Sequence, residues 1–235
     1  MISYAPPPVD TEADALNGQP HLLLQHANAP RMPTGSGIVW HSWGQGAVLV
    51  LLHDWNHSWQ EWQHNIEPLS RKFQVCVAQL PGSLEKHAPD WEDTQAWALA
   101  LRSDLHAFFP GQSFSLLGQG WGSILAAYIA PDMEQLSSLV LLGVGGHGSA
   151  PHLAAPQPDV LAAKLQRHWQ YFSKPALLIW GEGEGVPSPS RAAITLAAGH
   201  EEREWMALPN AAYPLQQTCA TEVNMVLTHW LLSHS

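Results

Sequence analysis

The sequence contains few charged residues, and only a third of these are basic. Charged residues make up 13% of the 235 positions, with 10 Lys and Arg against 20 Asp and Glu, so the formal net charge is −10. An acidic chain without clusters of Lys or Arg lacks the electrostatic footprint of a protein that binds nucleic acid or an anionic membrane surface. We therefore expect neither nucleic acid nor membrane as a partner.

Cysteine and long apolar runs are also scarce. The two cysteines, Cys76 and Cys219, fit a reduced intracellular protein better than a disulfide framework. No apolar run approaches the roughly 20 residues that a membrane span needs. The opening segment, MISYAPPPVDTEADALNG, has neither the basic region nor the apolar region of a signal peptide. Together these absences predict a cytoplasmic location.

Hydrophobic residues are plentiful, at 46% of the chain, and they fall into alternating strand-like and helix-like segments. Near-continuous apolar runs such as AVLVLLHDW (47–55) are typical of strands buried on both faces. Segments such as WEDTQAWALALRSDLHAFF (91–109) repeat their apolar residues at helical spacing. The alternation predicts the α/β class, with a mostly parallel central sheet and helices on both faces. Two further segments, 21–27 and 37–43, suggest a β-hairpin near the start.

We expect a single domain that carries an N-terminal arm and a short lid. Residues 1–20 are rich in Pro, Asp and Ala and are predicted to form an N-terminal arm. Residues 21–235 show no internal repeat and no second domain. A short lid is expected at about 146–174, where 159–172 reads as one amphipathic helix.

The stretch SFSLLGQGWGSILAAYIA (113–130) reads as a strand, a tight glycine turn and an apolar helix. This is the layout of a nucleophile elbow, G-x-S-x-G, but the apex position is Gly120. An apex of this kind has φ > 0, and glycine removes the strain of about 1–3 kcal/mol that another residue bears there. One interpretation is a site that has lost its nucleophile. The alternative is that the missing side chain leaves room for a ligand, with the N–H of Trp121 binding a carboxylate, phosphate or carbonyl oxygen.

Five segments occur in the order found in the α/β-hydrolase family, and the chain resembles that family from about residue 20 onward. They are VLVLLHDWNHSWQEW (48–62), FQVCVAQLPGS (73–83), LLGQGWGS (116–123), ALLIWGEGEGVPSP (176–189) and MALPNAAYPLQQ (206–217). The resemblance is to the esterase and epoxide-hydrolase branch with a reduced lid. It implies the α/β-hydrolase fold with a minimal lid.

The resemblance also places the catalytic triad, and two of its three positions lack the usual residue. Gly120 stands at the nucleophile, Tyr213 at the histidine and Glu184 at the acid, with Glu182 two residues earlier. Acyl transfer needs a hydroxyl, a histidine to take its proton and a carboxylate to orient that histidine. In addition, Asp54 replaces the small residue of the oxyanion loop, and a carboxylate there would repel a developing oxyanion.

Other residues of the chain offer alternative nucleophiles or metal ligands. Ser123, Ser149 and Cys76 are alternative nucleophiles, of which Ser123 lies inside the first turn of the helix and Cys76 in mid-strand. The histidines and carboxylate of HDWNH (53–57), together with His147 and His152, suggest metal ligands. Their spacing matches no metal motif, so we expect no metal and no other cofactor.

The residues beside the elbow complete the predicted site. We expect His53, Asp54, Trp55, His57 and Trp121 around the oxyanion position, with Trp59 also near the mouth, which favours an aromatic-walled pocket. The sequence thus predicts a degenerate hydrolase, a pseudoenzyme that binds a small apolar ligand or a protein partner. One alternative is a non-covalent acid/base enzyme of the lyase, isomerase or cyclase type using these groups with Glu184 or Tyr213. A second alternative is an esterase-type hydrolase with a relocated nucleophile.

Overall fold

The computed structural model describes residues 36–55, 57–80, 91–143, 169, 172–183 and 200–234. The predicted arm at 1–20, the first hairpin segment at 21–27 and nearly all of the predicted lid at 146–174 lie outside these residues. The described residues therefore do not test those three predictions.

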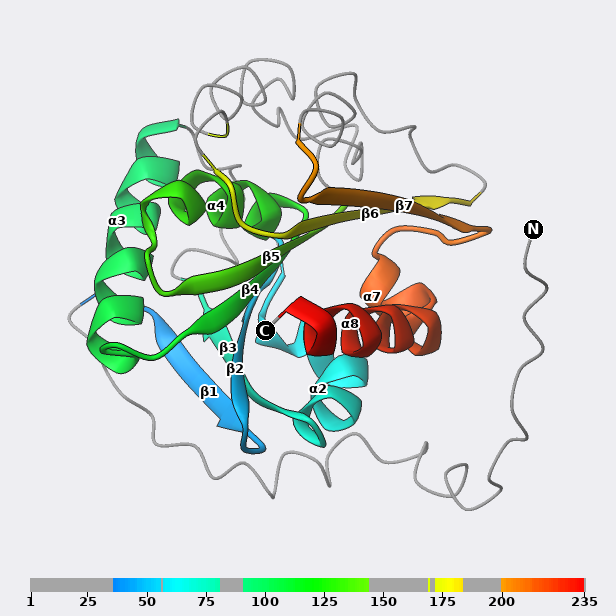
Figure 1. Cartoon of the computed structure of the whole chain (residues 1–235), viewed down its shortest axis with the longest axis horizontal. Coiled ribbons are helices and arrows are strands. Elements are labelled where there is room, and N and C mark those ends of the chain that lie inside the picture. Colours follow the sequence, from blue (N-terminus) through cyan, green and yellow to red (C-terminus); the bar gives the residue numbers. More distant parts are fainter. Residues whose placement is uncertain are drawn as a thin grey trace.

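The described residues form one seven-stranded sheet in the order β1-β3-β2-β4-β5-β6-β7 (Figure 1). The strands are β1 (Val39–Trp43), β2 (Ala47–Leu52), β3 (Phe73–Gln79), β4 (Phe114–Gln119), β5 (Leu136–Leu142), β6 (Ala176–Glu182) and β7 (Arg203–Pro209). Every neighbouring pair is parallel except β1 and β3, which are antiparallel. The segment predicted as the second half of a hairpin contains β1, which pairs with β3 at one end of the sheet that the described residues form.

Helices cover both faces of the sheet (Figure 1). The helical elements are η3 (Trp59–Trp62), α2 (Gln63–Ser70), α3 (Trp91–Phe108), α4 (Trp121–Ile129), η4 (Ala130–Asp132), α7 (Leu215–Thr218) and α8 (Ala220–His234). Helices α3 and α4 pack on one face, and α2, α7 and α8 pack on the other. None of the described helices is long and apolar enough to cross a membrane.

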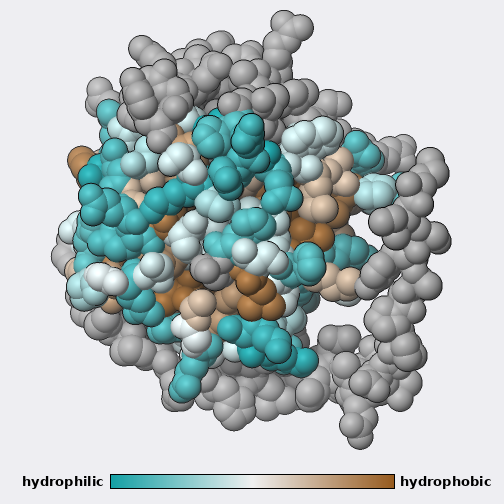
Figure 2. All heavy atoms as spheres, viewed as in Figure 1, coloured by the Kyte–Doolittle hydropathy of each residue, from teal (hydrophilic) through white to brown (hydrophobic). Residues whose placement is uncertain are grey.

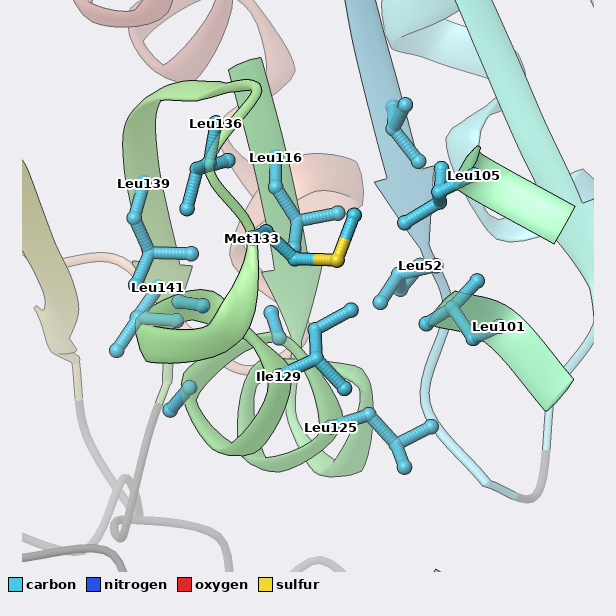
Figure 3. Close-up of a cluster of buried hydrophobic side chains, with 14 of the residues drawn as sticks. Leu52, Leu101, Leu105, Leu116, Leu125, Ile129, Met133, Leu136, Leu139 and Leu141 are labelled. Carbon is cyan, nitrogen blue, oxygen red and sulfur yellow. The ribbon is translucent and has the colours of Figure 1, made fainter. Parts of the chain in front are cut away.

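The core consists of two apolar layers, one on each side of the central strands. Alternate residues of β2 show the division, because Val50 and Leu52 belong to the layer under α3 and α4, whereas Leu49 and Leu51 belong to the layer under α2 and α8. Figure 3 shows the first layer, where leucines from β4 and β5 meet leucines from α3 and α4. Burial on both faces explains why these strands read as continuous apolar runs, and it confirms the predicted α/β class.

On the outside of the molecule, polar and apolar residues are interspersed in the view of Figure 2. The important feature for function lies inside, at the sheet's carboxyl edge. From β2 the chain crosses to β3 on one side, and later to β4 on the other. Such a switch in strand order is the usual ligand position in open parallel sheets. The loops after β2 and β4 therefore define where a site is expected.

Candidate functional site

The turn between β4 and α4 has the backbone of a nucleophile elbow. Gly120 has φ 54° and ψ −115° and precedes the first residue of α4, Trp121. Its N–H donates to the Leu142 carbonyl of the neighbouring strand β5 at 3.0 Å, which fixes the turn to the sheet. This φ lies in the left-handed region that glycine adopts without a Cβ penalty.

The third glycine of the turn, Gly122, is required by close packing rather than by its backbone angles. A Cβ on Gly122 would lie 2.5 Å from the carbonyl oxygen of Leu52 at the end of β2. The helix therefore crosses β2 at a distance that only glycine allows. This contact brings the start of α4 directly against the loop that follows β2.

That loop is held in shape by His53, which is fully buried. The backbone N–H of Leu80 donates to His53 Nε2 at 3.1 Å, so Nδ1 carries the proton and donates to the Asp54 carbonyl at 2.7 Å. Burial lowers the pKa of His53 to about 4, so the ring is neutral at neutral pH. Both ring nitrogens are thus used to hold backbone groups, which gives His53 a structural role in the loop.

The carboxylate of Asp54 occupies the oxyanion position. Its Oδ1 accepts hydrogen bonds from the backbone N–H of Trp121 at 2.7 Å and from that of Trp55 at 2.8 Å. In an α/β-hydrolase two backbone N–H groups form the oxyanion hole. One belongs to the residue after the nucleophile, here Trp121, and the other to the loop that here follows β2. Asp54 is only 4% exposed. Both donors are therefore bound to an internal carboxylate oxygen.

The second oxygen of Asp54 is bound by Tyr213. The Tyr213 hydroxyl donates to Asp54 Oδ2. Burial, and then the charge of Asp54, raise the pKa of Tyr213 well above its ordinary value, so the hydroxyl stays protonated. A Cβ on Gly120 would lie 2.4 Å from Asp54 Oδ2 and 2.6 Å from the Tyr213 oxygen. The carboxylate and the hydroxyl therefore occupy the space in which an elbow side chain would begin.

Glu61 supports this loop from η3 and was not predicted as a site residue. Its Oε2 accepts the Asp54 N–H at 2.9 Å, and its Oε1 accepts from the side-chain amide of Gln216 in α7. His57 Nδ1 lies 3.5 Å from the same Oε1. Burial raises the pKa of Glu61 to about 8. The only signal in the sequence is a single acid between the tryptophans of WQEW (59–62).

The tryptophans predicted for the site pack against two separate core layers. Trp121 contacts Trp97 of α3 edge to face, with ring centroids 4.7 Å apart, and Trp55 packs half-buried against the same core layer. Trp59 instead stacks with Trp43 and His41 near the edge strand β1. Trp59 therefore packs against the core layer opposite to that of Trp55 and Trp121, and its predicted place at the mouth stays a prediction.

The remaining predicted residues have other partners or lie outside the described residues. Ser123 Oγ donates to the carbonyls of Gly118 and Leu142, and Cys76 is a buried thiol whose pKa burial raises. Glu182 is exposed at the end of β6. Outside the described residues lie Glu184, His147, Ser149 and His152. Within the described part of the chain, no three His, Cys, Asp or Glu side chains are grouped to hold a metal ion.

Comparison with known proteins gives relatives among hydrolases. No family model matches the sequence. The chain is 35% identical over 148 residues to the pimeloyl-acyl-carrier-protein methyl ester esterase of Vibrio campbellii, covering 59% of this chain and 53% of that protein. It is 33% identical over 94 residues to a soluble epoxide hydrolase of Corynebacterium sp., covering 40% and 32%. The matched region thus spans about half the length or less of these curated relatives.

Solved structures show the same fold over most of the chain. The meta-cleavage product hydrolase of Pseudomonas fluorescens superposes with a TM-score of 0.68 at 14% identity, covering 85% of this chain and 96% of that one. A putative lipase of Acinetobacter baumannii gives a TM-score of 0.67 at 17% identity, covering 86% and 90%. Together with its mostly parallel sheet and its elbow between β4 and α4, these similarities show that the chain has the α/β-hydrolase fold.

Proposed function

We propose that this protein is a non-hydrolytic member of the α/β-hydrolase fold family that binds a small apolar ligand or a protein partner. The observation that carries this proposal is the position of the Asp54 carboxylate, which accepts both oxyanion-hole N–H groups on one oxygen. An ester carbonyl that entered the site would find neither donor available. Loss of a single oxyanion donor already lowers kcat about 10²–10³-fold in a working hydrolase.

The absence of a nucleophile at the elbow points the same way. Gly120 carries no side chain, and the nearby Ser123 hydroxyl is already hydrogen-bonded to two carbonyls at 2.6 and 3.0 Å. A hydroxyl held in this way is turned into the core and away from the turn's apex. We therefore expect no acyl-enzyme.

The position that resembles the catalytic histidine also lacks a base. Tyr213 is a hydrogen-bond donor to Asp54, and its raised pKa keeps it protonated. A general base must accept a proton near the working pH. Tyr213 supplies a fixed donor instead, which supports a binding role rather than a hydrolytic one.

Aromatic side chains next to the filled hole support an apolar ligand. Trp55 and Trp121 provide the two N–H groups. The Trp121 ring packs edge to face on Trp97, and Trp55 packs against the same core layer on the α3 and α4 side of the sheet. Aromatic surfaces of this kind contribute large contact areas to small-molecule sites. A ligand that contacts these rings would bind them through its apolar surface.

A second candidate is a hydrolase in which Asp54 is the relocated nucleophile. It is favoured by one observation: Asp54 Oδ2 lies 2.4 Å from where a Gly120 Cβ would be, so a carboxylate stands at the elbow although it comes from another loop. Attack on an epoxide carbon would give an alkyl ester of Asp54. Incubation with styrene oxide followed by intact mass measurement tests this candidate, and we expect no added mass because Tyr213 already binds the attacking oxygen.

The main experiment is an ester hydrolysis assay on three proteins. The natural chain and the double variant Gly120→Ser/Tyr213→His are compared with the triple variant that adds Asp54→Ala, using p-nitrophenyl butyrate. We expect turnover only in the triple variant, because the double variant still has its oxyanion donors bound to Asp54. Circular dichroism confirms that each variant is folded. Saturable turnover by the natural protein would overturn the proposal.

A further inference from the structure

We propose that the oxyanion-hole donors of this protein form a binding site for monocarboxylates, and that the Asp54 side chain is its resident, autoinhibitory ligand. The inference rests on the proposed function, because it treats the site as one for binding. It adds the chemical class of the ligand and the group that competes with it.

Three donors converge on one carboxylate. Trp121 donates from the N-terminus of the nine-residue helix α4, Trp55 donates from the loop after β2, and Tyr213 donates its hydroxyl to the other oxygen. Backbone N–H groups at a helix N-terminus favour an anion through the helix dipole. The site is therefore not inferred from a helix end alone, because a carboxylate is bound in it.

The donors fit one negative charge. In the part of the chain that the structure describes, no Lys or Arg contacts the Asp54 carboxylate, and all three donors are neutral. A dianion such as phosphate would keep an uncompensated charge in a buried place, which is costly. Trp55 and Trp97 are only partly buried, so their rings can contact an apolar substituent of the ligand. The chemistry thus selects an apolar monocarboxylate.

Asp54 competes with such a ligand from within the same chain. A tethered group acts at an effective concentration in the millimolar range or above, so an external carboxylate must exceed it to bind. Removing the Asp54 carboxylate removes the competitor and leaves the donors. We therefore expect Asp54→Ala to tighten monocarboxylate binding by at least about tenfold.

The variant should keep the loop in place, because the Asp54 backbone is held independently of its side chain. Its N–H donates to Glu61 at 2.9 Å, and its carbonyl accepts from His53 Nδ1 at 2.7 Å and from the His57 N–H at 3.1 Å. These three hydrogen bonds remain when the side chain is shortened. The backbone N–H of Trp55 and of Trp121 should then keep their directions.

The test titrates sodium butyrate and sodium phenylacetate into the full chain at constant ionic strength, with binding measured by calorimetry and by tryptophan fluorescence. The proteins are the natural chain, Asp54→Ala, Asp54→Ser as a second shortened variant, and Asp54→Asn as a control that still fills the site. Sodium phosphate is the dianion comparison. We expect tight binding in the Ala and Ser variants only, and weaker binding of phosphate.

Three results would overturn the inference. They are no gain in a folded Ala or Ser variant, an equal gain in Asp54→Asn, or phosphate binding more tightly than butyrate. Failure of the proposed function is distinguishable, since it would appear as ester turnover by the natural chain. Binding of butyrate produces no such turnover and is measured without it.

Discussion

The Tyr213 hydroxyl donates a hydrogen bond to Asp54 Oδ2, although the two residues are 159 positions apart in the chain. Tyr213 follows β7 and Asp54 follows β2, so the contact joins two loops at the carboxyl edge of the sheet. In a working hydrolase the corresponding loops hold the histidine and half of the oxyanion hole. In this protein the hydrogen bond between Tyr213 and Asp54 joins the two loops, and the Asp54 carboxylate occupies the oxyanion position.

The strength of this contact can be measured by a double-mutant cycle. We expect Asp54→Ala and Tyr213→Phe each to lower the free energy of unfolding by about 1–3 kcal/mol, because each leaves a buried polar partner unpaired. The double variant should cost less than the sum of the single variants. Urea unfolding followed by circular dichroism provides the four values. Additive costs would show that the two side chains do not interact.

Tyr128→Phe is the matched control for the tyrosine substitution. Its hydroxyl accepts from Gln95 at 3.4 Å in an exposed position. Removal of a surface hydroxyl of this kind usually changes stability by less than about 0.5 kcal/mol. If Tyr128→Phe lowered the free energy of unfolding as much as Tyr213→Phe does, the loss would not be specific to the contact with Asp54.

Adding a side chain at Gly120 should be unusually costly. Gly120→Ala places a Cβ 2.4 Å from Asp54 Cγ and also imposes left-handed backbone strain, so we expect a loss of about 2–5 kcal/mol. Gly111→Ala separates the two effects, since Gly111 has φ +71° but nothing within 4 Å of its Cβ position. The Gly120 variant should lose clearly more stability than the Gly111 variant. Equal losses would mean that Asp54 does not occupy the space above the turn.

Removing Asp54 should restore part of the stability of Gly120→Ala. In the Asp54→Ala background the clash with the Asp54 carboxylate is relieved, whereas the close approach to the Tyr213 hydroxyl and the backbone strain of about 1–3 kcal/mol remain. The same unfolding assay measures this recovery. A Gly120→Ala loss that is unchanged by the second substitution would contradict the contact between the two positions.

Glu61 should make the protein less stable as the pH rises from 6.5 to 8. Its pKa is about 8 in the folded protein and 4.5 in the reference state, so the folded chain binds a proton that the unfolded chain has released. This contribution is complete below pH 4.5 and is lost as the pH approaches 8, with a slope of up to about 1.4 kcal/mol per pH unit. Glu61→Gln should be nearly flat over this interval. A profile identical to that of the natural chain would exclude a protonated Glu61.

His53 should produce the opposite slope at lower pH. Its pKa is about 4 when folded and 6.5 in the reference state, so between these values the unfolded chain binds the additional proton. The contribution of His53 to stability should therefore rise from pH 4 to 6.5, and above pH 4.5 it opposes the fall that Glu61 produces. His53→Gln keeps one donor and one acceptor for the Asp54 carbonyl and the Leu80 N–H, and it should lose this rise. An unchanged acid profile would contradict a neutral, buried His53.

The sequence allowed the fold to be predicted because each element depends on a local pattern. The apolar run of β2 and the glycines at 118, 120 and 122 indicate a buried strand and a tight elbow whichever side chains face them. The run predicted as a strand over 47–55 ends at Leu52, and the His53 ring then binds the backbone of the loop that follows. Ends of elements depend on such single contacts.

The partners within the site were harder to predict. The sequence placed Asp54 near the oxyanion position as a repelling charge, whereas the structure turns its carboxylate into the position as an acceptor. Tyr213 was predicted only as the residue at the histidine position, and the structure shows its hydroxyl bound to Asp54. Both outcomes depend on side-chain direction across loops more than 60 residues apart in sequence. No periodicity or spacing in the sequence records such directions.

The most direct test of the account is intact-protein mass spectrometry after incubation of the natural chain with an excess of a fluorophosphonate. A serine activated for hydrolysis would displace fluoride and retain the phosphonyl group. The account predicts an unchanged mass, because Gly120 offers no nucleophile and Asp54 occupies the oxyanion donors. Stoichiometric addition of one phosphonyl group would contradict it, and peptide mapping would identify the residue that carries the activity.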